Sequence, residues 1–421
     1  MLRSLLFASV VIALMFAGWL LLLPPATTFD AASPVPAEDN ALATRGEYLA
    51  IAGNCASCHT APGGEQMAGG LPFVTPFGTI HSTNITPDAE TGIGNWSFAD
   101  FANSMRHGVR PDGTQLYPVF PYTAFTRISD DDLAAIFAYL NSLPAIRQPT
   151  PANDLSFPFN IRALMKAWKA LFFEYGVYEP DATQSDEWNR GAYLVEALAH
   201  CGECHTPRNA LGAARAGSPM AGGEYLDRVP GGGHRPWFAP DLTSSDTGLA
   251  LWPEGELAAY LKTGRNFFIE TFGPMNEVIM NSTSRLGEDD IRAMTVYLKE
   301  LSGSAQAVRA PVPERIMGRG RTIYNLHCGT CHLPTGEGDP DMAPKLNRGS
   351  LVVQAVNPAS MINAILYSPE GPDLPPRWRE RMDEFQYILD DEEVAAVASY
   401  IRNSWGNRAG LVTPDQVARQ R

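Results

Sequence analysis

Apolar residues recur at helical spacing in three separate parts of the chain. Each segment places them at or near positions i, i+3, i+4 and i+7, which predicts an amphipathic helix with one apolar face. The apolar positions are Leu133, Ile136, Phe137 and Leu140; Ile291, Met294 and Leu298; and Val394, Val397, Ala398 and Ile401. A tyrosine holds one equivalent place in the three segments, at Tyr139, Tyr297 and Tyr400. The chain is therefore predicted to repeat one structural unit.

A further helical segment with a glycine and an aromatic residue lies before the cysteine pair of each repeat, well ahead of the amphipathic helix. The three copies contain Gly46 and Tyr48, Gly191 and Tyr193, and Gly320 and Tyr324. Two of the later helices begin with capping-box spacing, at Ser129 with Asp132 and at Asp390 with Glu393. Each repeat is thus predicted to pair an amino-terminal helix with a carboxyl-terminal one.

The first two repeats also share a middle section. It reads Asn84-Ile85-Thr86, Gly92, Trp96 and a helix to Gly108 in the first, and Asp241-Leu242-Thr243, Gly248, Trp252 and a helix to Gly264 in the second. The third repeat is shorter here. Proline-rich or polar stretches separate the copies, so we expect domains at residues 42–146, 186–302 and 312–408.

The linker at residues 147–185 contains one further helical pattern, over residues 161–175. Its aromatic and aliphatic positions share one face beside basic residues. They are Leu164, Trp168, Leu171, Phe172 and Tyr175, with Arg162, Lys166 and Lys169 beside them. Such a helix fits docking on a partner, contact with lipid, or packing between two domains.

The amino terminus carries an uncharged apolar run over residues 4–23. About 20 such residues suffice to span a bilayer as a helix. Arg3 precedes the run and Asp30 follows it, which by the positive-inside rule places everything after residue 24 on the periplasmic side. Residues 1–24 are therefore interpreted as a retained membrane anchor, with a cleaved signal peptide as the alternative. Both interpretations place the rest of the chain at the periplasmic side of the cell inner membrane.

All six cysteines fall in three Cys-x-x-Cys-His motifs. They are Cys55, Cys58 and His59; Cys201, Cys204 and His205; and Cys328, Cys331 and His332. This spacing suits two thioether bonds to one haem, with the histidine as an iron ligand. A redox dithiol needs no following histidine, three motifs cannot be paired into four-ligand zinc sites, and disulfides within the motifs would close very short loops. Three covalently bound haem c groups are predicted.

Paired helices that cross beside a haem make the class I cytochrome c fold, so we expect a mainly α protein of three such domains in tandem. A methionine before the last helix of each domain is the expected second iron ligand, because a thioether favours ferrous iron. Met275 and Met382 hold that place in the second and third domains. In the first, Phe120 stands there instead.

Four residues of the first domain can replace the missing methionine: Met67, Met105, His81 and His107. Met105 is favoured, because the helix from Trp96 must pack against the distal side of the haem to bury its apolar residues. On that helix His107 would point about 160° away from Met105. Met67 ranks second, and an iron with an open sixth position remains an alternative.

The net charge of the chain excludes one class of binding partner. With 32 basic and 46 acidic residues, its formal net charge is -14, which would repel a polyanion. Nucleic acid is therefore an unsuitable partner. The chain also lacks a glycine-rich dinucleotide fingerprint after a strand and lacks a P-loop.

Several strings in residues 42–408 resemble one known family. They are Gly69-Gly70-Leu71-Pro72, Thr75-Pro76-Phe77-Gly78-Thr79-Ile80, Ser82-Thr83-Asn84-Ile85-Thr86-Pro87 and Ser404-Trp405-Gly406-Asn407. Together with three haem motifs they resemble the three-haem cytochrome c subunits of the bacterial membrane-bound alcohol, aldehyde, gluconate and fructose dehydrogenases.

The resemblance implies a redox subunit rather than an enzyme. A large catalytic subunit with a molybdenum, quinone or flavin cofactor would oxidise the substrate, an aldehyde or alcohol above all, and the haems would pass electrons to ubiquinone in the membrane. Family members have Tyr-Pro-x-Met-Pro-Tyr where this chain has Phe120. Members with phenylalanine there and a methionine in the preceding helix look more like partners of molybdenum-containing aldehyde-oxidising subunits.

Two other classes of function stay open from the sequence. A haem enzyme such as a peroxidase would use an open first haem. A freestanding electron carrier or oxidase subunit would need no catalytic partner.

Overall fold

The structure is a computed structural model of the 421-residue chain and describes residues 40–229, 233–304, 309–371, 374 and 381–421. The predicted anchor or signal segment at residues 1–24 lies outside this part. Within it, no helix is both long enough and apolar enough to cross a membrane. The chain forms two compact units, one ending at Glu179 and the other comprising Ile51–Ser57 and Pro180–Arg421.

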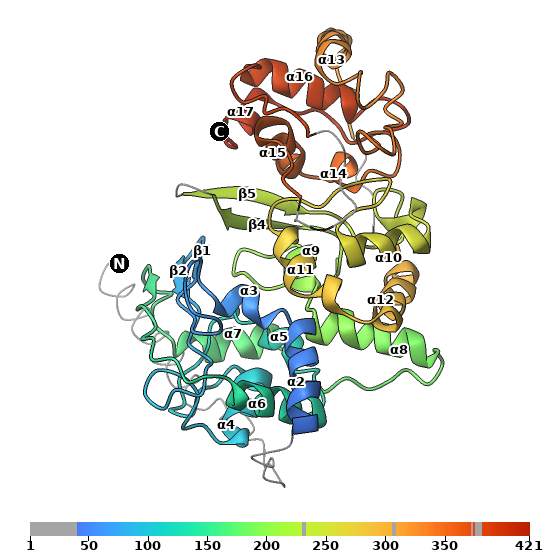
Figure 1. Ribbon diagram of the computed structural model, residues 1–421. Helices are drawn as coiled ribbons and strands as arrows, with labels where there is room; N and C mark the ends of the chain where they lie inside the picture. Colours follow the sequence, from blue (N-terminus) through green and yellow to red (C-terminus); the bar gives the residue numbers. More distant parts are fainter. Residues whose placement is uncertain (1–39, 230–232, 305–308, 372–373, 375–380) are drawn as a thin grey trace, which may run out of the picture. The chain divides into compact units, whose positions relative to one another are not determined.

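Helices predominate, as predicted (Figure 1). Up to the linker the elements are α2 (Asn40–Ala52), α3 (Cys55–His59), β1 (Pro72–Thr75), β2 (Gly78–His81), α4 (Phe98–His107), α5 (Tyr122–Phe125), α6 (Asp130–Ser142), β3 (Asp154–Leu155) and α7 (Leu164–Phe172). The second repeat contains α8 (Asp186–Tyr193), a π-helical turn (Leu194–Leu198), α9 (Gly202–His205), β4 (Gly223–Arg228), β5 (His234–Ala239), 3-10 turns (Leu249–Leu251 and Thr283–Arg285), α10 (Glu254–Thr263), α11 (Met275–Asn281) and α12 (Glu288–Glu300). The third contains α13 (Glu314–His327), α14 (Leu351–Gln354), α15 (Ala359–Tyr367), α16 (Asp391–Ile401) and α17 (Pro414–Ala418).

In every repeat the amino-terminal helix crosses the carboxyl-terminal helix at a glycine. A methyl group on Gly46, Gly191 or Gly320 would lie 1.8, 2.0 or 2.2 Å from the carbonyl oxygen of Ala135, Ala293 or Ala396. The same methyl group would also meet the Cβ of Tyr139, Tyr297 or Tyr400. The predicted equivalence of these glycines and tyrosines is confirmed. Only a residue without Cβ permits this approach of two backbones.

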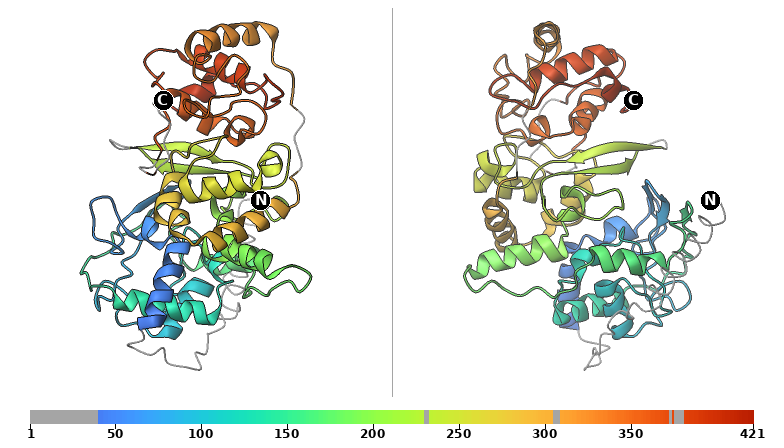
Figure 2. Two further views of the ribbon diagram at one scale, coloured as in Figure 1. Left: turned by 45° about the vertical axis from the view of Figure 1, so that its right-hand side comes forward. Right: turned by 180° about the vertical axis from the view of Figure 1, so that it is seen from behind.

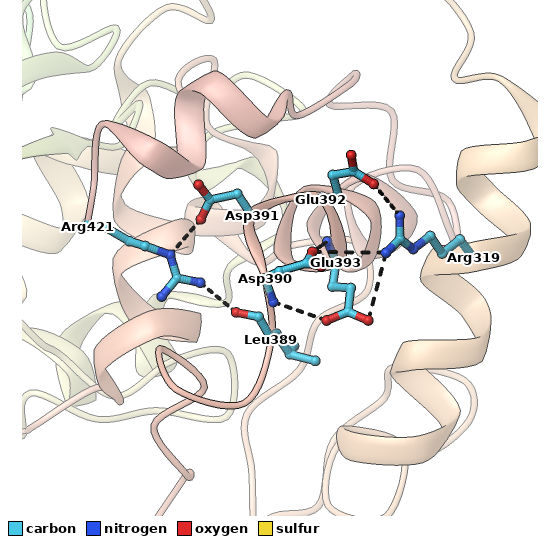
Figure 3. Close-up of polar contacts among 7 residues, drawn as sticks. All are labelled: Arg319, Leu389, Asp390, Asp391, Glu392, Glu393 and Arg421. Carbon is cyan, nitrogen blue, oxygen red and sulfur yellow. Dashed lines mark hydrogen bonds and ion pairs between the residues drawn. The ribbon is translucent and has the colours of Figure 1, made fainter.

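An arginine before each of these glycines reaches the first turn of the partner helix. Arg190 donates two hydrogen bonds of 2.8 Å to Asp290, and Arg45 pairs with Asp132. Arg319 lies 2.7 Å from Glu392 and 3.8 Å from Glu393 (Figure 3). These pairs are partly exposed, and such pairs stabilise by about 0–1 kcal/mol. Their main effect is to fix how each helix is rotated against its partner.

Both predicted caps form, one of them completely. At α16 the Asp390 side chain accepts from the N–H of Glu393, whose carboxylate accepts from the N–H of Asp390, which is a full capping box (Figure 3). At α6 Ser129 accepts from the N–H of Asp132, while the Asp132 carboxylate pairs with Arg45.

The shared middle sections of the first two repeats fold alike. Helices α4 and α10 both end at a glycine in the left-handed region, Gly108 (φ 60°) and Gly264 (φ 74°), as predicted. Two residues before these glycines, the buried Arg106 donates to the Ile128 carbonyl at 2.8 Å, and Lys262 donates to the Leu286 carbonyl at 2.5 Å. Each cation ties the middle helix to the segment that opens the last helix.

The linker packs on the first repeat. Strand β3 joins the antiparallel β1–β2 hairpin, and a methyl group on Gly78 would lie 2.2 Å from the Asp154 carbonyl oxygen. In α7, Met165, Ala167 and Trp168 are buried. The predicted apolar face is therefore only partly covered, since Leu171 is 65% exposed.

Within the second unit, the second and third repeats pack against each other. The β4–β5 hairpin lies against α15 (Figure 2). A small core of Phe238, Ala355 and Ala359 closes this contact.

Substitutions in α13 test the helix crossing. Gly320→Ala forces a methyl group against the Ala396 carbonyl and is expected to lower the free energy of unfolding by about 1–3 kcal/mol. Gly318→Ala is the matched control, because among the described residues no atom outside the neighbouring backbone of α13 lies within 4 Å of the added methyl group. It should stabilise the helix by about 0.5–1 kcal/mol. Unfolding in urea is measured by near-ultraviolet circular dichroism. Equal urea midpoints for the two variants would contradict the close contact of the two helices at Gly320.

The linker contact depends on Lys169. Its ammonium donates to the carbonyls of His107 (2.5 Å) and Gly108 (2.9 Å) and to the Gln115 side chain (2.8 Å). Lys169→Ala should lower the free energy of unfolding by about 1–3 kcal/mol, because these acceptors lose a charged donor. Thermolysin should then cleave the linker faster than in the parent protein. The exposed Lys166, substituted by alanine, serves as control, and equal cleavage of both variants would contradict the role of Lys169.

Candidate functional site

The first and third Cys-x-x-Cys-His motifs closely follow α2 and α13, and the second follows the π-helical turn that continues α8. The first forms α3, the second includes α9, and the third follows α13 at Cys328. The structure describes all six cysteines, and none of them forms a disulfide. Burial of the thiol groups raises the pKa of Cys55, Cys201 and Cys328 to about 12. A redox dithiol needs a lowered thiol pKa, so this environment does not suit that chemistry.

Each motif histidine is oriented by a main-chain carbonyl. Nδ1 lies 2.7 Å from the Thr83 oxygen in His59, 2.7 Å from the Pro240 oxygen in His205, and 2.9 Å from the Pro344 oxygen in His332. With its proton on Nδ1, each ring donates this hydrogen bond and keeps the Nε2 lone pair for a metal.

Burial also favours the neutral form of these histidines. It lowers the pKa of His59, His205 and His332, and the hydrogen bond to the carbonyl only partly opposes this effect. Neutral imidazole is the form that binds iron. The three sites therefore share one arrangement: two thiols and a neutral imidazole held with Nε2 available.

The third site contains a cavity of about 500 Å³ that suits a large planar cofactor. Cys328, Cys331, His332 and the predicted ligand Met382 all line it. Ser368 donates to the Met382 carbonyl at 2.6 Å, which fixes that backbone. The histidine and the methionine thus face one cavity.

In the second site, Met275 opens α11 and is half-buried. Before it, Gly273 adopts φ 62° and packs on the Trp237 ring, which a methyl group there would approach to 2.7 Å. The buried Nε1 of Trp237 has no hydrogen-bond partner among the described residues. A haem carboxylate is an acceptor that would satisfy it.

In the first site Phe120 stands where a methionine ligand was expected, and its ring packs against Phe125.

The structure also shows the surroundings of the candidate ligands. His107 faces the linker, because its ring stacks on Tyr175 with centroids 4.7 Å apart. Met105 is buried on α4 near the equally buried Phe101. The Nδ1 atom of His81 is buried without a hydrogen-bond partner among the described residues. The second iron ligand of this site stays a prediction.

Met67 has a structural counterpart that sequence comparison of the repeats did not reveal. Met67 and Met220 both adopt left-handed φ, 62° and 57°, and their N–H groups donate to Thr60 and Thr206, the residues after the motif histidines. A methyl group on Gly202, between the motif cysteines, would lie 3.6 Å from the Met220 side chain. Met67 is itself buried, and by equivalence with Met220 we expect it to pack behind the first motif.

The sequence analysis did not predict which carbonyl groups bind the motif histidines. In two repeats the sequence held a clue, because Thr83 and Pro240 directly precede the shared strings that begin at Asn84 and Asp241. Those strings identified a repeat but not the hydrogen bond it provides.

Cysteines without disulfides in Cys-x-x-Cys-His motifs, beside neutral histidines oriented for a metal, define a c-type cytochrome. A family model for cytochrome c matches residues 43–144 and 317–405. The fructose dehydrogenase cytochrome subunit of Gluconobacter japonicus is 36% identical over 90% of this chain and 82% of its own length. The cytochrome c subunit of the quinone alcohol dehydrogenase of Gluconobacter oxydans is 37% identical over 94% of this chain and 85% of its own length.

A third relative is longer. A nicotinate dehydrogenase subunit of Pseudomonas putida is 41% identical over 86% of this chain, which spans only 30% of that protein. The chain belongs to the family of cytochrome subunits of the bacterial fructose, alcohol and gluconate dehydrogenases. Its class as a redox subunit of a dehydrogenase follows from this membership.

Substitution of Met105 tests the ligand of the first iron. Met105→Ala should abolish the thioether-to-iron charge-transfer band of one haem and lower the potential of that haem, because the thioether stabilises ferrous iron. Met67→Leu is the control and should leave band and potential unchanged. An unaltered spectrum in Met105→Ala would refute the assignment, and rapid carbon monoxide binding by the parent protein would favour an open iron.

Proposed function

We propose that this protein carries three covalently bound haems and passes electrons from the catalytic subunit of a periplasmic dehydrogenase to ubiquinone. The observation that carries the proposal is a threefold recurrence: two cysteines without a disulfide lie beside a histidine whose Nδ1 is hydrogen-bonded to a main-chain carbonyl. Bound haem iron would cycle between the ferric and ferrous forms.

The roles of the residues follow from their chemistry. The thiols of each motif would form thioethers, and His59, His205 and His332 would bind iron through Nε2. Met105, Met275 and Met382 would be the further iron ligands, and their thioethers would raise the reduction potential and keep substrate from binding iron. The chain itself then performs no substrate chemistry.

The catalytic partner is proposed by analogy with the relatives. Two of them are named as cytochrome subunits of sugar or alcohol dehydrogenases. We infer a large subunit with a molybdenum, quinone or flavin cofactor that oxidises an aldehyde or an alcohol. Residues 1–24 would hold the protein at the inner membrane or direct its export, with the haem domains on the periplasmic side.

A second candidate function rests on the first site. Because Phe120 replaces the expected methionine, an open first iron would suit a peroxidase-like haem enzyme. A freestanding carrier or oxidase subunit is the third candidate, and it would accept electrons without a dedicated catalytic partner.

Haem stoichiometry and quinone reactivity test the proposal. A pyridine haemochrome assay should give three haems per chain, all resistant to acid-acetone extraction because thioethers hold them. The dithionite-reduced protein should be reoxidised by decylubiquinone. Fewer than three haems would contradict the count, failure to react with the quinone would favour a freestanding carrier, and turnover of hydrogen peroxide would favour the haem enzyme.

A further inference from the structure

A loop of the second repeat forms part of the wall of the third site. Residues 266–272 contribute Phe268, Ile269, Glu270 and Phe272 to the cavity of about 500 Å³ that contains His332. Three residues after Phe272 the same loop reaches Met275, the proposed iron ligand of the second site. One short segment therefore lies between the two sites.

A single peptide group joins this loop to the iron-binding histidine of the third site. The Pro344 carbonyl oxygen lies 2.9 Å from Nδ1 of His332, and the Lys345 N–H of that peptide group donates to the Phe267 carbonyl at 3.4 Å. The path from the imidazole to the second repeat thus consists of two hydrogen bonds and one delocalised peptide group.

Aromatic packing holds the loop in place. The Phe268 ring stacks on the Trp252 ring, with centroids 5.2 Å apart and an interplanar angle of 17°. Trp252 donates from Nε1 to the Gly349 carbonyl of the third repeat at 2.7 Å. The Lys345 ammonium lies 4.7 Å from the Phe267 ring centroid and 5.1 Å from that of Phe268. Cation and rings attract each other across the boundary between the repeats.

Further contacts make this boundary rigid. The Ser360 hydroxyl accepts from the Phe238 N–H at 2.9 Å and donates to its carbonyl at 3.0 Å. The Arg235 guanidinium lies 3.4 Å from the Tyr367 ring centroid. Hydrogen bonds, a small apolar core and stacked cations keep the two repeats in fixed register, which electron exchange between fixed sites requires.

We propose that residues 266–272 and the peptide group between Pro344 and Lys345 form the electron-transfer bridge between the second and third haem sites. One electron leaves the ferrous iron of one site and reduces the ferric iron of the other. No proton moves and no bond changes. The inference rests on the proposed attachment of haem at both sites. It makes the Phe268 ring a part of the electron-transfer bridge.

The test uses the full three-haem protein after pulse-radiolytic partial reduction, with electron redistribution among haems followed by absorbance. A variant with Cys328 and Cys331 both changed to alanine lacks the third haem and identifies its spectrum by difference. In Phe268→Leu the stacked ring is lost, and exchange with the third haem should slow several-fold while haem count and midpoint potentials stay the same. Lys345→Met, which removes the cation from the boundary, should slow the exchange in the same direction.

Phe137→Leu is the control, matched in residue type and burial. Phe137 is buried in the first repeat, where its ring packs on Phe101, and it does not line the cavity of the third site. Its substitution should leave the exchange rate between the second and third haems unchanged. An unchanged rate in Phe268→Leu, or equal slowing in Phe268→Leu and Phe137→Leu, would overturn the bridge even if three haems are present and react with quinone. A protein with fewer haems would instead overturn the proposed function.

Discussion

The approach of two backbones at one glycine is the constraint on which each repeat depends. Gly46, Gly191 and Gly320 let a helix pack directly against an alanine carbonyl of the partner helix. The arginine before each glycine fixes the rotation of the pair, and the haem motif follows the first helix within eight residues. The position of the thiols and of the histidine is therefore set by a contact that contains no haem ligand.

Local patterns were sufficient for the features that lie within one element. Gly108 and Gly264 end helices, because a residue without Cβ adopts left-handed φ at little cost. The tyrosines of the last helices align because they face the same glycine. The cysteines and histidines expected to hold haem are named individually from the sequence, since thioether and iron chemistry require that spacing.

Features that join distant segments could not be found this way. The loops between the motif histidines and their carbonyl partners differ in length, so Thr83, Pro240 and Pro344 fall at no constant distance from the motif. Met67 and Met220 occupy one backbone position at different separations from their histidines. The contact of residues 266–272 with the third site depends on packing between two repeats, which neither repeat encodes alone.

The use of a main-chain carbonyl to orient each histidine has a consequence for mutation. A side-chain acceptor could be deleted by a single nucleotide change, whereas every amino acid supplies a carbonyl oxygen. Threonine at position 83 and proline at positions 240 and 344 perform the same task. A change of side chain at these three positions therefore leaves the acceptor in place, and the imidazole stays aimed at its metal in repeats whose loops differ in sequence.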